Sequence, residues 1–104
     1  MTREYDKLVR DGIPGIIEAD GETPVVHTAS GDEYERRLGE KLAEEVAEYR
    51  ESGDVEELAD VLEVVHALRE QHGVSGEELQ EIRERKADDR GRFDDGVVLE
   101  RVLE

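Results

Sequence analysis

Apolar residues recur every three or four positions through the middle of the chain, and this is the spacing of an amphipathic α-helix. The first run predicts a helix over about 33–51, with apolar positions at Tyr34, Leu38, Leu42, Val46 and Tyr49. Gly53 follows as a stop signal, and a second run predicts another helix over about 55–72. The short link between the two runs predicts an antiparallel hairpin.

Shorter signals flank this hairpin. Ser75 opens a third helix over about 76–90, because a glutamate three residues later completes a capping box. Near the start of the chain, Pro14 suits the first turn of a short helix. Residues 25–28 and 97–102 are rich in β-branched side chains and are predicted to form a minor pair of short strands near the termini.

The second long helix is apolar around roughly 220° of its circumference, which is more than one packed face requires. The residues on this wide face are Val55, Leu58, Ala59, Val61, Leu62, Val64, Val65 and Leu68. We therefore expect packing on two sides, by the chain itself and by a second copy. The predicted fold is a single all-α domain over residues 1–104, whose helical hairpin forms a four-helix-type bundle in a homodimer or higher homo-oligomer.

The composition is unusually acidic for such a domain. The 104 residues include 30 acidic and 14 basic side chains, giving a formal net charge of −16. Charged residues make up 42% of the chain and aromatic residues 4%, a balance that favours disorder, but the helical periodicity indicates a packed core. An excess of surface acid of this kind, as in halophilic proteins, keeps a protein dispersed at high salt.

Charge and composition also exclude several function classes. The chain has no basic stripe for a nucleic-acid backbone, and its negative surface is repelled by anionic membranes. It has no cysteine, so neither disulfides nor thiolate chemistry are expected. No signal-peptide or membrane-spanning pattern is present in the sequence, and the expected location is the cytoplasm.

A few acids do not fit the surface explanation. On a helical wheel Glu45 lies within about 20° of Leu38, inside the apolar stripe, and Glu48 flanks that stripe. On the second helix Glu57 and Asp60 lie within or beside the wide apolar face. A carboxylate on a core face is costly unless it is paired or binds a cation.

The hairpin brings these acids to matching heights. Glu48 and Glu57 each lie about one turn from the link, and Glu45 and Asp60 each lie about two turns from it. Four converging carboxylates require protons or hard cations, and an all-oxygen ligand set suits Mg²⁺, with Mn²⁺ as an alternative. The opposing interpretation is surface charge plus a helix cap at Glu57.

The same residues resemble a known superfamily. Residues 44–48 (EEVAE) and 57–60 (ELAD) look like the EExxE…ExxD signature of the MazG-like all-α nucleoside triphosphate pyrophosphohydrolases, which include phosphoribosyl-ATP pyrophosphohydrolase. Residues 5–14 (YDKLVRDGIP) are similar to the YDKLVRDxIP start of a small branch of that superfamily. The gap of eight residues between the two acidic motifs is shorter than usual for MazG proteins.

This resemblance implies roles for particular residues. The superfamily's metal ligands correspond to Glu45, Glu48, Glu57 and Asp60. Glu44 or Glu45 is the candidate catalytic base that takes a proton from the attacking water.

Four basic side chains are candidate substrate contacts. Lys7 and Arg10 belong to the N-terminal motif, and a local ion pair with Asp11 is the alternative for Arg10. Lys86 and Arg90 resemble the later Lys…Arg…Phe element of the superfamily, and the wheel places them on the side of Leu79 and Ile82. Pairing with the abundant acids is the alternative for these two cations.

The resemblance implies a house-cleaning reaction, in which a nucleoside triphosphate, of noncanonical type, is hydrolysed with Mg²⁺ to a monophosphate and pyrophosphate. Two alternatives stay open. One is an enzyme dedicated to phosphoribosyl-ATP, and the other is a catalytically silent helical dimer that binds nucleotide or metal as a regulator.

Overall fold

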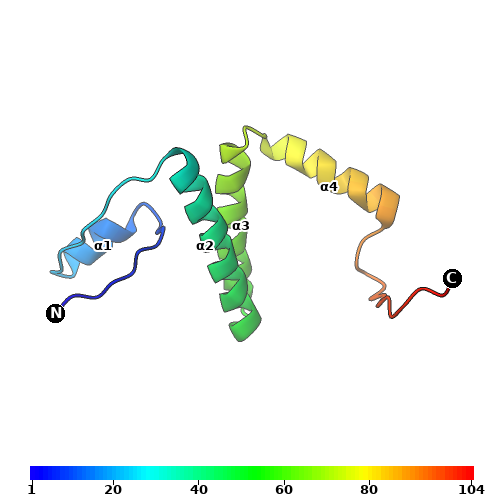
Figure 1. Ribbon diagram of the computed structural model, residues 1–104, viewed down its shortest axis with the longest axis horizontal. Coiled ribbons are helices and arrows are strands. Elements are labelled where there is room, and N and C mark those ends of the chain that lie inside the picture. Colours follow the sequence, from blue (N-terminus) through cyan, green and yellow to red (C-terminus); the bar gives the residue numbers. More distant parts are fainter.

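The computed structural model describes residues 1–104 as four helices joined by irregular segments (Figure 1). The helices are α1 (Ile13–Ala19), α2 (Gly31–Ser52), α3 (Val55–Gln71) and α4 (Gly76–Arg90). The all-α class is therefore confirmed. Each of the three long helices begins and ends within two residues of the predicted bounds.

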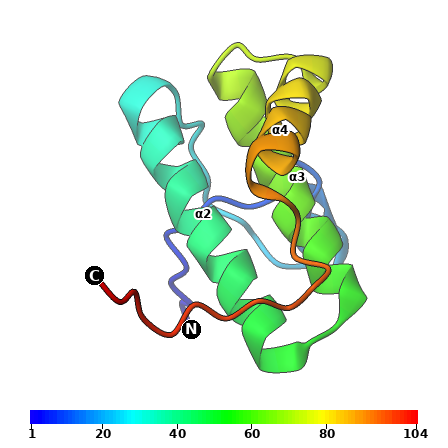
Figure 2. The ribbon, with the colours of Figure 1, turned by 90° about the vertical axis from the view of Figure 1, so that its right-hand side faces the viewer.

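The centre of the fold is the hairpin of α2 and α3, which lie side by side in both ribbon views (Figures 1 and 2). Gly53 ends α2 with a φ of 70°, a left-handed conformation that glycine adopts without strain. Leu38 on α2 and Val64 on α3 are only 2% and 7% exposed, and they are the buried apolar side chains of the chain.

The start of α3 differs from the prediction in one detail. Asp54 occupies the N-cap position, but its side chain accepts no hydrogen bond from the helix. Its backbone N–H donates instead to Oγ of Ser52 at 3.1 Å. Asp54, with Glu57 three residues later, matches the sequence pattern of a capping box, but that box does not form, and Glu57 is left free to join the other carboxylates of the hairpin.

Helix α4 begins as the sequence predicts but then leaves the hairpin. The hydroxyl oxygen of Ser75 accepts a hydrogen bond from the N–H of Glu78 at 3.0 Å. Arg69 fixes the preceding turn by donating to the carbonyl oxygen of Val74 at 2.7 Å. From there α4 contacts α3 but not α2, and it points away from both helices (Figure 1).

The predicted strand pair is absent. Residues 25–28 and 97–102 are irregular, and their side chains are exposed. A β-strand needs a neighbouring strand to pair its backbone groups, and neither segment meets one in this chain. Local β-propensity alone was not enough to form the ladder.

The outline is elongated, with extents of 61 × 31 × 26 Å and a radius of gyration of 18.4 Å. A compact domain of this length has a radius of gyration near 13 Å. Much apolar surface stays open as a result, including Val55, Leu58 and Leu62 on α3. One side of the wide apolar face is packed by the chain itself, while the other side has no cover. None of the helices combines the length and the apolar character needed to cross a membrane.

Candidate functional site

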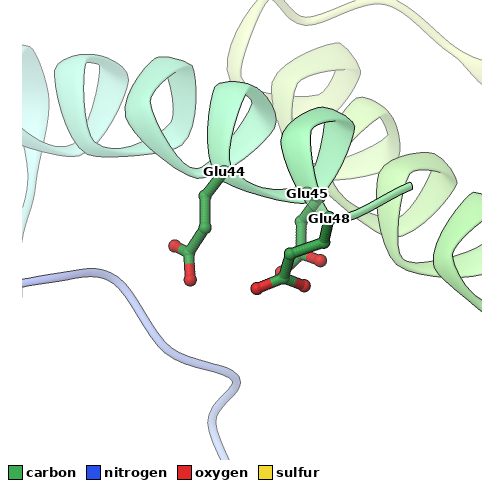
Figure 3. A group of neighbouring side chains, drawn as sticks. All are labelled: Glu44, Glu45 and Glu48. Carbon is green, nitrogen blue, oxygen red and sulfur yellow. The ribbon is translucent and has the colours of Figure 1, made fainter. Parts of the chain in front are cut away.

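The hairpin brings together the four carboxylates singled out in the sequence, with Glu44 beside them. One oxygen from each of Glu45, Glu57 and Asp60 lies within 4.8 Å of the other two, and the same holds for Glu44, Glu45 and Glu48. Glu45 belongs to both groups and joins them. The five residues are called the carboxylate cluster below. Figure 3 shows its three α2 members projecting from one side of the helix.

Glu45 is the unusual member, because it is only 7% exposed and is the buried charged residue of the chain. Its Oε1 atom lies 3.1 Å from Nζ of Lys41. Its Oε2 atom is buried and has no hydrogen-bond partner. A buried carboxylate oxygen without a partner carries a desolvation cost that a hydrogen bond or a cation normally offsets.

Repulsion between the acids perturbs their titration. The pKa of Glu48 is raised. The main cause is a hydrogen bond with the Glu45 carboxyl, which can form only when one of the two groups carries a proton, and the second cause is the like charge of Glu45. The pKa of Glu57 is also raised, first by partial desolvation and then by the charges of Asp60 and Glu45. This part of the cluster therefore has too little positive charge around it.

Glu44 has the opposite environment. The Nζ atoms of Lys7 and Lys41 lie 2.8 Å and 3.3 Å from its carboxylate oxygens. The hydrogen bond from Lys7 is the main reason that the pKa of Glu44 is lowered. Glu44 therefore stays ionised. Lys41 was missed in the sequence, although its i, i+3 and i, i+4 spacing to Glu44 and Glu45 is a recognisable signal.

Residues 1–12, called the N-terminal segment below, run past the cluster without forming a helix or strand. Lys7 from this segment reaches Glu44 on α2. Arg10 reaches Asp60 on α3, with 2.8 Å between Nη2 and Oδ1. The alternative pairing of Arg10 with Asp11 is not the one formed. Both candidate cations of the N-terminal motif thus contact the carboxylate cluster.

Lys86 and Arg90 are not brought to the cluster. Both are exposed on α4, which has no contact with α2 (Figure 1). Leu79 and Ile82, on the same side of α4, do face α3 beside Val65 and Leu68, but they remain more than one-third exposed. These two apolar residues are too few to hold α4 along the whole hairpin.

The donor set fits a hard divalent cation. Oxygens that share one Mg²⁺ at about 2.1 Å lie within about 4.2 Å of one another, so the 4.8 Å grouping needs only small side-chain adjustments. The buried, unpartnered Oε2 of Glu45 offers a ligand atom that no protein group uses. The nearby cations, Lys7, Lys41 and Arg10, neutralise Glu44, one oxygen of Glu45, and Asp60.

Comparison with known proteins gives a relative for part of the chain. An uncharacterized protein of Mycolicibacterium smegmatis is 59% identical to it over 44 residues, which are 42% of this chain. The matched part spans 45% of that protein, less than half of its length. No model of a protein family matches the chain. No solved structure matches it either.

Proposed function

We propose that this protein hydrolyses a nucleoside triphosphate to a nucleoside monophosphate and pyrophosphate, with Mg²⁺ or Mn²⁺ held by Glu45, Glu48, Glu57 and Asp60. The observation that carries the proposal is the buried Glu45, whose Oε2 has no hydrogen-bond partner and whose carboxylate lies among four others, those of Glu44, Glu48, Glu57 and Asp60. The resemblance of the acidic motifs and of the YDKLVRDGIP segment to MazG-like pyrophosphohydrolases supports the same reaction.

The chain's own residues have distinct tasks in this proposal. Bound Mg²⁺ supplies charge neutralisation of the phosphates and a lower pKa for an attacking water. Lys7 and Arg10 bind phosphate oxygens, because both cations already lie at the edge of the cluster. A glutamate, Glu44 or Glu45, accepts the proton of the water that attacks the α-phosphorus, and the bond to the β-phosphate oxygen breaks.

Glu44 is a weaker base while Lys7 is bound to it, because that hydrogen bond lowers its pKa. Transfer of Lys7 to a substrate phosphate would remove this effect and return the basicity of Glu44 toward that of an ordinary glutamate. Substrate binding would then prepare the base as well as place the phosphates.

The proposal includes a homodimer. A second copy covers the open apolar side of α3, where Val55, Leu58 and Leu62 lie on one helix face. In such a dimer, α4 carries Lys86 and Arg90 to the carboxylate cluster of the second copy, because α4 leaves its own hairpin. The elongated outline of the single chain is in keeping with this arrangement.

The direct test is pyrophosphate release from a panel of canonical and modified nucleoside triphosphates with Mg²⁺, at low and at high salt. Phosphoribosyl-ATP belongs in the panel, since activity confined to it identifies the dedicated enzyme instead. We expect Glu45→Gln to lower kcat by about 100-fold or more, as loss of a metal ligand removes transition-state charge stabilisation.

Glu35→Gln is the matched control, because Glu35 is an exposed glutamate of the same helix with no ion pair. It should leave turnover unchanged. Mg²⁺ binding without release of pyrophosphate from any nucleotide would contradict the enzyme and favour the silent regulator.

A further inference from the structure

The two cations of the N-terminal segment reach the carboxylate cluster from a stretch of chain that has no secondary structure of its own. Lys7 contacts α2 and Arg10 contacts α3, so the segment bridges the two helices of the hairpin. The residues between them, Leu8 and Val9, are half-buried. Both contacts are solvent-accessible ion pairs, and such pairs contribute little by themselves to holding a segment in place.

A stronger attachment lies just before Lys7. The guanidinium of Arg37 donates from Nη1 to the main-chain oxygen of Asp6 and from Nη2 to its Oδ1, both at 2.8 Å. The Arg37 side chain is 11% exposed, and it also reaches Oε2 of Glu33 at 3.4 Å. This paired contact is the kind that arginine forms with good geometric definition.

The backbone at Asp6 is unusual in the same place. Asp6 has a φ of 43°, and it is the residue other than glycine that has a positive φ in this chain. This backbone conformation costs energy unless the surrounding structure holds it. The two bonds from Arg37 fix both the main chain and the side chain of this residue. The turn at Asp6 directs the following residue, Lys7, toward Glu44.

Arg37 is also suitably placed along α2. It precedes Glu44 by seven residues, so the two side chains lie on nearly the same face of the helix, about 10 Å apart along its axis. Lys41 lies between them on that face and contacts Glu44 and Glu45. A segment held at Arg37 therefore passes along the face that carries the cluster.

We propose that Arg37 is a positioning residue for phosphate binding: by holding Asp6 it keeps Lys7 and Arg10 beside the carboxylate cluster, from which both cations transfer to the phosphates of a nucleotide. The inference rests on the proposed function for its substrate. If Glu45, Glu48, Glu57 and Asp60 held a divalent cation, Arg10 would lose Asp60 as its partner, and Lys7 and Arg10 at the edge of the cluster would donate to the phosphate oxygens instead.

The first arm of the test needs no activity. Trypsin cleaves after Lys7 and Arg10, and cleavage after the exposed Arg92 serves as the internal reference. In Arg37→Ala and in Asp6→Ala, we expect cleavage after Lys7 and Arg10 to become several-fold faster relative to Arg92, because the segment opens more often. Arg36→Ala is the control, since Arg36 is the neighbouring arginine and pairs only with Glu40.

The second arm measures binding of inorganic tripolyphosphate with Mg²⁺ by calorimetry. Arg37→Ala should weaken this binding by about tenfold, the size expected for poorly placed charged hydrogen bonds, while Mg²⁺ alone binds as tightly as in the original protein. In a chain that already carries Lys7→Ala and Arg10→Ala, adding Arg37→Ala should change the affinity by less than about twofold, since a positioning residue acts through the groups it places.

These outcomes separate the two proposals. Normal tripolyphosphate binding and unchanged trypsin cleavage in Arg37→Ala would overturn the positioning role and leave the enzyme proposal intact. Failure of the original protein to bind tripolyphosphate would also overturn it. If tripolyphosphate binding falls as expected but no nucleotide is hydrolysed, the positioning role stands and the enzyme proposal fails.

Discussion

The α2–α3 hairpin and helix α4 are both rich in acidic residues, yet they hold them in different ways. In the hairpin, the chain buries Glu45 and gathers other carboxylates around it, and basic side chains from the N-terminal segment approach from outside. On α4 the acidic residues are all exposed and no second helix lies across them.

Acid content alone therefore does not mark a site. The acids on α4 need nothing beyond water, as on many soluble helices. Glu45 is different because it has been removed from water while one of its oxygens has no protein partner. Packing on two facing helices thus buries one carboxylate of an acidic sequence, and burial makes its charge costly unless it is paired.

The largest expected effect is on the stability gained from Mg²⁺. At about 100 times its dissociation constant, a ligand specific for the folded state stabilises it by about 2.7 kcal/mol. For a domain of this size, that corresponds to a rise in Tm of roughly 10–20 °C, measured by differential scanning calorimetry. Glu45→Gln should remove most of the rise.

The matched variant on α4 is Glu81→Gln, an exposed glutamate, which should keep the full Mg²⁺-dependent rise. Equal stabilisation of both variants would break the contrast between hairpin and α4, because it would place the bound cation outside the cluster.

The next effect concerns the open side of the hairpin. Leu62→Asp puts a charge on the apolar face of α3 that we expect a second copy to cover. An unpaired charge in such an interface costs about 2 kcal/mol or more, so the dimer dissociation constant should rise by roughly 30-fold or more. Size-exclusion chromatography with light scattering measures it.

Glu63→Gln changes the charge of an exposed neighbour on the same helix and should leave the dimer intact. A monomer at every concentration of the unaltered protein would contradict the proposed assembly.

A smaller effect is the pH dependence of the metal-free protein. The pKa values of Glu48 and Glu57 are raised above 4.5 in the folded state, so folding favours their protonated forms. Their contribution to stability is complete at a pH below their pKa in the unfolded chain. It is lost as the pH rises through their higher pKa values in the folded protein. We expect Tm to fall as pH rises from about 4.5 toward neutrality.

The Glu48→Gln and Glu57→Gln double variant should have a flatter Tm profile over the same pH range. Glu44 does not confuse this test, because its lowered pKa affects stability below the ordinary value and in the opposite direction. A profile as steep as that of the original protein would assign the pH dependence to other groups.

The smallest effect tests α4. Ser75→Ala removes the N-cap hydrogen bond to Glu78 and should cost about 1 kcal/mol of helix stability. Because α4 contacts only α3, the loss should appear as reduced helical circular dichroism while the hairpin keeps its Tm. A cooperative fall in the Tm of the whole protein would mean that α4 and the hairpin unfold together.

The parts of the fold that follow from local signals were predictable from the sequence. Helix bounds depend on periodicity and on stop residues such as Gly53, and both act within a few positions of the chain. The meeting of Glu45 with Asp60 followed from these bounds, because a short link leaves two helices little choice except to run antiparallel.

The parts that depend on distant contacts were not predictable in the same way. Arg10 pairs with Asp60, fifty residues away, rather than with the adjacent Asp11, and no periodic pattern marks the N-terminal segment. The direction of α4 was equally hidden, since Leu79 and Ile82 face α3 but nothing in the sequence shows that the helix misses α2. Whether a side chain pairs with a near or a distant residue depends on the tertiary structure as a whole.

The tight turn at Gly53 has one more consequence, which concerns how the protein can change over time. It keeps the whole carboxylate cluster within residues 44–60, a single stretch whose ends are joined by local contacts. A hairpin with so short a link closes with little loss of loop-closure entropy. The alignment of the acids therefore does not depend on residues 91–104, which contribute nothing to the cluster and can change in sequence without disturbing it.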